Sequence, residues 1–100
     1  MKPYTVYITP DAFSEIKELP GNIRQRVRQA VRDLANNPRP PQSKILNVPE
    51  FGRELWRLRL DSWRIVYAIT QEDNVVDVLT VRKRPPYDYG DLETLLEDLE

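Results

Sequence analysis

The chain has 100 residues, 40% of them apolar and 31% charged, which is enough for one domain with one modest hydrophobic core. It contains no histidine and no cysteine, so the usual ligands of zinc and copper, the usual acid–base group at neutral pH and any disulfide are excluded. We therefore expect no metal site, no cofactor and a reducing, cytoplasmic location, and any catalysis has to use Arg, Lys, Tyr or carboxylates.

The charge is distributed unevenly, although the net charge is only −1. Residues 88–100 hold six acidic residues and no basic residue, so residues 1–87 carry 15 basic against 10 acidic residues, a net charge of +5. A basic body is suited to polyanions such as nucleic acid. The longest apolar run, Ile65–Ile69, is too short to cross a bilayer, and no apolar leader follows Lys2, so no membrane partner is expected.

The first part of the chain predicts a strand followed by two helices. Residues 4–9 are β-formers, and Thr9 and Pro10 are typical of a helix N-cap and of the first helical position. Pro20 and Gly21 interrupt the first helix. The second helix has one apolar stripe, formed by Ile23, Val27, Ala30, Val31 and Leu34. Two helices joined by so short a turn are expected to form an antiparallel hairpin.

The second part of the chain predicts an antiparallel sheet. After a proline-rich connector (residues 37–44), a short strand is expected at 44–48 and longer ones at about 53–60, 63–70 and 75–82, with short turns between them.

A final helix is expected over residues 90–100, where an apolar stripe is formed by Leu92, Leu95, Leu96 and Leu99. The predicted class is α+β: an N-terminal strand, a two-helix hairpin, an antiparallel sheet of three to four strands and a C-terminal helix, in one domain spanning residues 1–100.

Basic residues recur inside the predicted sheet. Arg57 and Arg59 share one face of their strand, and Arg64 follows on the next strand. The last strand ends in a run that contains Arg82, Lys83, Arg84, Tyr87 and Tyr89. Guanidinium groups on rigid strands suit phosphate oxygens, and tyrosines stack on bases, so a nucleic-acid site is one interpretation. The alternative is a solvated sheet face that carries charged side chains, and the pattern alone leaves both open.

The sequence resembles the RelE/ParE superfamily of toxins from type II toxin–antitoxin systems. The likeness lies in LPGNIRQRVRQAVRDLANNPRP (19–40), LWRLRLDSWRIVYAI (55–69) and VLTVRKRPPYDY (78–89), which together cover most of the chain. The middle segment carries the most specific part: basic–x–basic on one strand, a turn, then aromatic–Arg–apolar–Val–Tyr. The resemblance implies the α+β fold of that family and favours its RelE branch.

The RelE branch implies a metal-independent endoribonuclease that cuts mRNA on the ribosome and leaves 2′,3′-cyclic phosphate and 5′-hydroxyl ends. Carried over by position, its catalytic residues fall on Arg57, Arg59, Arg64, Arg84 and Tyr87. Arg82, Lys83 and Tyr89 are then expected to bind RNA, with Tyr89 as the competitor of Tyr87. The branch often has lysine at the first two positions. Arginine does not lose its proton, so Arg57 and Arg59 are poor general bases.

The resemblance also implies partners: a cognate antitoxin protein, the ribosome and mRNA. Two alternatives stay open. One is a ParE-like inhibitor of DNA gyrase, which acts by binding. The other is a non-toxic homologue whose role is to bind an antitoxin-like peptide.

Overall fold

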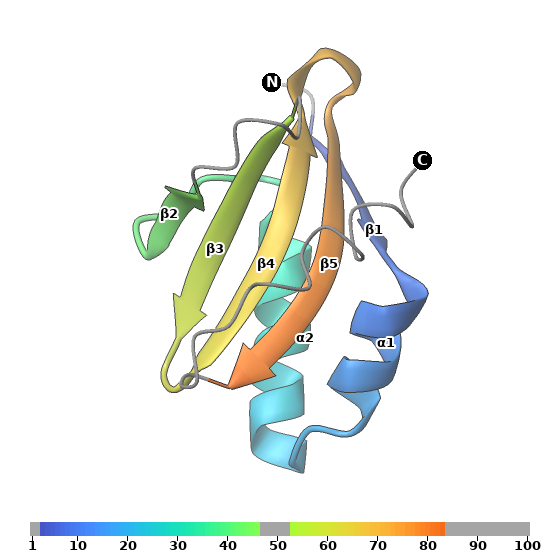
Figure 1. Cartoon of the computed structure of the whole chain (residues 1–100), viewed down its shortest axis with the longest axis vertical. Coiled ribbons are helices and arrows are strands. Elements are labelled where there is room, and N and C mark those ends of the chain that lie inside the picture. The colour runs from blue at the N-terminus through green and yellow to red at the C-terminus, as the bar shows by residue number, and fades with distance from the viewer. Residues whose placement is uncertain (1–2, 47–52, 84–100) are drawn as a thin grey trace.

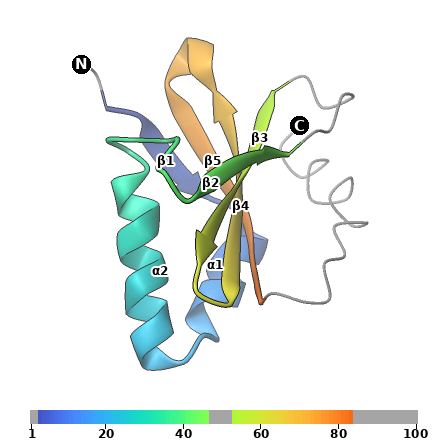
Figure 2. The same ribbon diagram turned by 90° about the vertical axis from the view of Figure 1, so that its left-hand side faces the viewer.

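Two helices pack on one face of a single sheet in the computed structural model, which describes residues 3–46 and 53–83 (Figures 1 and 2). The elements in chain order are β1 (Thr5–Ile8), α1 (Pro10–Lys17), α2 (Gly21–Asp33), β2 (Ser43–Leu46), β3 (Glu54–Leu60), β4 (Trp63–Thr70), the short 3-10 helix η2 (Gln71–Asp73) and β5 (Val75–Lys83). The predicted C-terminal helix, together with Arg84, Tyr87 and Tyr89, lies outside the described residues.

The sheet has five strands in the order β1-β5-β4-β3-β2. Strands β2 to β5 pair with one another in antiparallel fashion, as the period-two pattern predicts, and β2 forms close to the segment expected at 44–48. The N-terminal strand was predicted, but not its place in the sheet: β1 joins the sheet parallel to β5 and makes it a mixed sheet. After the two helices, the chain enters the sheet at the opposite edge as β2, and the following strands bring β5 back beside β1.

The helices begin where the sequence predicts. Thr9 is extended, and its hydroxyl accepts a hydrogen bond from the N–H of Ala12, while Pro10 occupies the first helical position of α1. Helix α2 starts at Gly21, directly after Pro20. Both helices lie on the same side of the sheet (Figure 2). None of the helices in the described part of the chain is long and apolar enough to cross a membrane.

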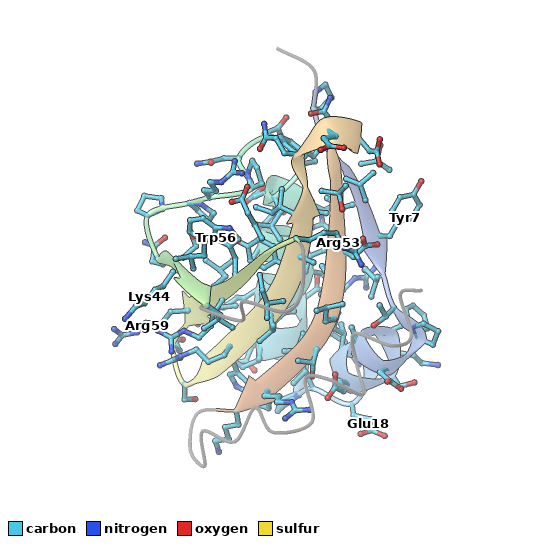
Figure 3. The ribbon with its side chains drawn as sticks, turned by 45° about the horizontal axis from the view of Figure 1, so that its top comes forward. Tyr7, Glu18, Lys44, Arg53, Trp56 and Arg59 are labelled. Atoms are coloured by element: carbon cyan, nitrogen blue, oxygen red, sulfur yellow. The ribbon has the colours of Figure 1, made fainter. Side chains whose placement is uncertain are left out.

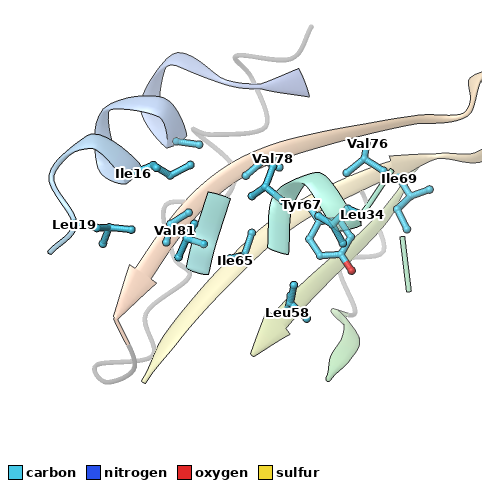
Figure 4. Packing of buried hydrophobic residues seen from close by; sticks show 13 residues of the cluster. Ile16, Leu19, Leu34, Leu58, Ile65, Tyr67, Ile69, Val76, Val78 and Val81 are labelled. Atoms are coloured by element: carbon cyan, nitrogen blue, oxygen red, sulfur yellow. The ribbon is translucent and has the colours of Figure 1, made fainter. Parts of the chain in front are cut away.

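The core lies between these helices and the sheet (Figure 4). Ile16 of α1 and Leu19 of the turn that follows it pack near Val78 and Val81 of β5, while Leu34 and Tyr67 lie towards the other end. Tyr67 is fully buried, and its hydroxyl donates to the carbonyl oxygen of Pro38 at 2.7 Å. This bond ties the proline-rich connector to β4, and burial raises the pKa of Tyr67 to about 12.

The β3–β4 hairpin closes with Asp61 and Ser62, the two residues predicted for it. Asp61 adopts the left-handed conformation (φ 54°), which aspartate tolerates better than most side chains. Its carboxylate forms an ion pair with Arg26 of α2, and this contact lowers the pKa of the Asp61 carboxyl. The end of the hairpin is therefore connected to the helical layer.

Candidate nucleic-acid interface

Five basic side chains share the sheet face that points away from the helices. Arg64 on β4 is directly opposite Arg59 on β3 and Arg82 on β5, and Lys44 on β2 is directly opposite Arg57. The alternate positions on these strands, such as Leu58, Ile65 and Val81, belong to the core under the helices. We call the following five residues the cationic face: Lys44, Arg57, Arg59, Arg64 and Arg82.

A β-bulge decides which residue of β5 joins this face. The register shifts between Val66 and Tyr67, which pair with Thr80 and Val78, so Leu79 is the extra residue on β5. Without it, the alternation that turns Val78 towards the helices would also turn Arg82 towards them. The bulge therefore moves Arg82 into line with Arg64.

The same alternation separates Lys83 from the cationic face. Lys83 is opposite Trp63, a residue that packs against the core on the helix side of the sheet, and Lys83 itself is exposed. Both Arg82 and Lys83 are expected from the resemblance to bind RNA. The geometry brings together Arg57, Arg59, Arg64 and Arg82 of the predicted residues and leaves Lys83 on the other face.

Arg64 occupies the centre of the cationic face and is 4% exposed. Its Nη1 donates to the carbonyl oxygens of Asp61 and Trp63, both at 2.8 Å, so the guanidinium folds over the hairpin turn. A buried charge is costly unless it has hydrogen-bond acceptors, and these two carbonyls supply them. Arg64 thus has a structural role, in addition to the positive potential that it contributes.

Two nitrogens of the cationic face lack hydrogen-bond acceptors in the described part of the chain. The Nε atoms of Arg57 and Arg64 are buried, and neither has a hydrogen-bond acceptor among the described residues. Native proteins satisfy the great majority of buried polar groups, and a catalytic role or a bound ion is among the explanations of an exception. A crowded cationic face with unmet donors is electrostatically suited to an anion.

Lys44, Arg57 and Arg59 of the cationic face differ from the arginines that form ion pairs elsewhere in the described structure. Lys44 and Arg59 are exposed at the β2–β3 side of the sheet (Figure 3). Within the described residues, no carboxylate forms an ion pair with Lys44, Arg57 or Arg59. Three other arginines do have such partners: Arg26 with Asp61, Arg39 with Glu54 and Arg53 with Asp77. The chain therefore has basic residues of two kinds.

Arg39 shows what a structural arginine looks like in this protein. It binds both carboxylate oxygens of Glu54, at 3.2 and 2.8 Å, and lies 5.7 Å from the centre of the Trp56 ring. Hydrogen bonding to Arg39 lowers the pKa of the Glu54 carboxyl, and the Trp56 indole adds a bond to the same group. These contacts link the proline-rich connector to the start of β3, whereas Arg59 lies near the end of that strand.

Sequence reasoning missed three residues that belong to this region. The sequence predicts a short strand at Lys44 but not the face of the sheet on which Lys44 lies. The pairing of Lys44 with Arg57 shows that it lies on the cationic face. Thr80 is fully buried, and its hydroxyl accepts from Nε of Arg82 at 3.2 Å. Glu15 on α1 accepts from that hydroxyl. No local pattern predicts the last two, because they become neighbours only through tertiary structure.

The cationic face can bind and stabilise negative charge. Arginine forks match the oxygens of phosphate and keep their charge at any physiological pH. The described residues hold no cluster of three or more His, Cys, Asp or Glu side chains that could bind a metal ion. The aligned guanidinium groups suit a chemistry in which they supply the charge stabilisation.

The fold is that of the RelE toxins. The RelE–RelB complex of Pyrococcus horikoshii aligns with a TM-score of 0.75 at 23% identity, over 84% of this chain and 98% of that one. The RelBE2 toxin–antitoxin complex of Mycobacterium tuberculosis aligns with a TM-score of 0.69 at 30% identity, over 82% and 99%. A RelE-like toxin protein of Escherichia coli is 27% identical over 89 residues, which is 89% of this chain and 92% of the relative.

A model of the ParE toxin of type II toxin–antitoxin systems matches residues 6–85. The chain belongs to this family, and it is a RelE-like toxin of a type II toxin–antitoxin system. The superfamily expected from the sequence is thereby confirmed. The matched segment contains the whole cationic face.

Proposed function

We propose that this toxin is a metal-independent, ribosome-dependent mRNA endoribonuclease that inhibits translation. The observation that carries the proposal is the line of Arg59, Arg64 and Arg82 across three strands, with Lys44 and Arg57 beside it. Residues held only for solubility do not need to be aligned in register on rigid strands. Like charges this close repel each other, and phosphate would relieve the repulsion.

In the proposed reaction, the 2′-oxygen of an mRNA nucleotide attacks its own 3′ phosphorus. The bond between phosphorus and the 5′-oxygen of the next nucleotide breaks, which gives a 2′,3′-cyclic phosphate and a 5′-hydroxyl. The 2′-hydroxyl loses its proton, and the leaving 5′-oxygen gains one. Arg57 and Arg59 would hold the backbone, while Arg64 would stabilise the charge that develops on the non-bridging oxygens.

The proposed proton transfers need other groups, because arginine remains protonated. From the resemblance, Arg84 supports the leaving oxygen, and Tyr87 orients the nucleotide or moves a proton. Both residues, and Tyr89 as the competing tyrosine, lie outside the described part of the chain. The ribosome would supply substrate geometry, and correct positioning alone accelerates such reactions by several orders of magnitude.

The partner that we propose for regulation is an antitoxin protein, since solved relatives are complexes of RelE with RelB. A groove of about 420 Å³ lies between β1, α1 and α2. Its apolar part includes Ile8 and Phe13, which are 41% and 55% exposed. Its basic part consists of Lys17, Arg24, Arg28 and Arg32. An acidic, amphipathic antitoxin segment would match this groove in both charge and hydrophobicity.

Induced expression followed by mapping of RNA ends tests the proposed activity. In-frame cuts within coding regions, soon after induction and before growth stops, are the expected result. Intact mRNA together with DNA damage would instead select the gyrase inhibitor, the second candidate that the ParE family model favours. Normal growth would select the non-toxic homologue.

A further inference from the structure

Helix α1 contributes a carboxylate to the edge of β5, close to the cationic face. Strand β1 pairs with β5 only as far as Val78, so within residues 3–46 and 53–83 the next residues of β5 have no strand beside them on that side. Glu15 supplies hydrogen-bond acceptors in place of a neighbouring strand. Its carboxylate accepts from the N–H of Val81 at 3.2 Å and from the hydroxyl of Thr80 at 2.8 and 2.9 Å. Glu15 is half-buried and Thr80 is fully buried.

The direction of these hydrogen bonds follows from counting protons. A carboxylate can only accept, so the single hydroxyl proton of Thr80 points to Glu15. The lone pairs of the hydroxyl oxygen are then left for a donor, and Nε of Arg82 donates to it at 3.2 Å. The chain of bonds runs from Arg82 through Thr80 to Glu15. The charge on Glu15 polarises the hydroxyl and strengthens its ability to accept.

We propose that Glu15 and Thr80 are positioning residues that hold the Arg82 guanidinium in line with Arg64 and Arg59 for RNA phosphate. The proposal rests on the proposed RNA-binding function of the cationic face. An arginine has several rotatable bonds, and ordering it before phosphate arrives removes an entropic cost of binding. The alternative is that Glu15 only ties α1 to the sheet, and experiment separates the two.

The test uses the full chain and four substitutions. Thr80→Val keeps the shape of the side chain and removes the hydroxyl, while Thr80→Ser restores the hydroxyl. Glu15→Gln keeps an acceptor for the Val81 N–H but offers Thr80 a donor, which competes with Arg82. Glu18→Gln is the control for charge: it removes one exposed carboxylate at the C-cap of the same helix, whereas the carboxylate bonded to β5 is that of Glu15 (Figure 3).

Two readouts are needed. The first is the NMR signal of the Arg82 Nε–H and its exchange with solvent, which reports on the hydrogen bond whatever the protein binds. The second is the affinity for a single-stranded RNA oligonucleotide. We expect Thr80→Val and Glu15→Gln to accelerate exchange of the Arg82 signal and to weaken RNA binding about three- to tenfold, the range for the net contribution of one typical hydrogen bond. Thr80→Ser and Glu18→Gln should behave as the unmodified chain does.

Three results would overturn the proposal, and they are distinguishable. An Arg82 signal that stays protected in Thr80→Val would show that Thr80 does not hold this side chain. A second result is faster exchange of the Arg82 signal with unchanged RNA affinity, while Arg57→Gln still weakens RNA binding. The proposed function would then stand, and Glu15 would only link α1 to the sheet. If Arg57→Gln has no effect on RNA affinity either, the cationic face is not an RNA site, and both proposals fail.

Discussion

The arginines of this small toxin fall into two kinds, distinguished by their partners. Arg39 has a carboxylate, a ring and an amide around it, since its Nη2 also donates to Gln71 at 2.7 Å. Arg59 is exposed, with no carboxylate partner among the described residues. The first arrangement stabilises the folded state, whereas the second leaves a positive charge available to a ligand.

Replacing one arginine of each kind should therefore change a different property: RNA binding in one case and the stability of the fold in the other. Arg59→Gln should weaken binding of single-stranded RNA and lower the slope of log affinity against log salt by about 0.7, the value for one phosphate contact, without changing the midpoint of urea unfolding. Arg39→Gln should leave RNA binding unchanged and lower the free energy of unfolding by about 1 kcal/mol. A loss of stability in Arg59→Gln equal to that in Arg39→Gln would contradict this division.

At the scale of the strands, one inserted residue determines the composition of the site. Leu79 occupies the bulge, so Arg82 is turned to the cationic face and Lys83 to the helix side. The two residues are adjacent in sequence and carry the same charge. They differ in the face of the sheet on which they lie, which makes them a natural matched pair.

We expect Arg82→Gln to reduce RNA affinity and Lys83→Gln to leave it within about twofold, because a charge on the far side of the sheet makes no phosphate contact. Fluorescence anisotropy with one labelled oligonucleotide measures both. Equal losses would mean that only total charge matters, and that the bulge has no part in forming the site.

A second prediction at this scale concerns the bond that ties the connector to β4. Tyr67→Phe leaves the carbonyl of Pro38 without its donor, so we expect about 1–2 kcal/mol lower stability near neutral pH. The folded-state pKa of Tyr67 is raised from 10.0 to about 12, so this contribution is present below pH 10 and is lost as the pH rises towards 12. Urea unfolding at increasing pH should show the difference between the two chains shrinking, and a constant difference would refute the assignment.

Local patterns predict much of this fold, and their failures have physical causes. Thr9, Pro10 and Asp61 act through neighbours in sequence, so the helix start and the hairpin turn could be predicted. The bulge at Leu79 could not, because a run of β-formers fits either register until β4 pairs with it. The role of Glu15 depends on residues 65 positions away along the chain, which no short-range pattern can reveal.

At the scale of the whole molecule, the two faces of the toxin carry different surfaces. The cationic face lies on the side of the sheet that points away from the helices, and the groove between β1, α1 and α2 lies on the helix side. On this account, RNA and the antitoxin segment use different faces. Substitutions in one surface should then leave binding to the other unchanged.

Phe13→Asp should weaken the complex with the antitoxin at least tenfold while the variant remains toxic, because it places a carboxylate in an apolar groove that would receive an acidic segment. Ile45→Asp is the matched control, since Ile45 is also exposed (53%) but lies on β2, at the opposite edge of the sheet. Titration calorimetry with the purified antitoxin measures both. Weakening by Ile45→Asp alone would place the partner on the β2 edge instead.

The central claim, that the aligned arginines cleave mRNA on the ribosome, is tested most directly in a reconstituted system of purified ribosomes, a synthetic mRNA and the toxin. We expect cleavage within the coding sequence, with 2′,3′-cyclic phosphate and 5′-hydroxyl ends, and a loss of at least 100-fold in rate, on the order expected for lost transition-state contacts, when Arg57 and Arg59 are both replaced by Gln. Intact mRNA at saturating toxin, or cleavage at an unchanged rate by the double variant, would contradict the account.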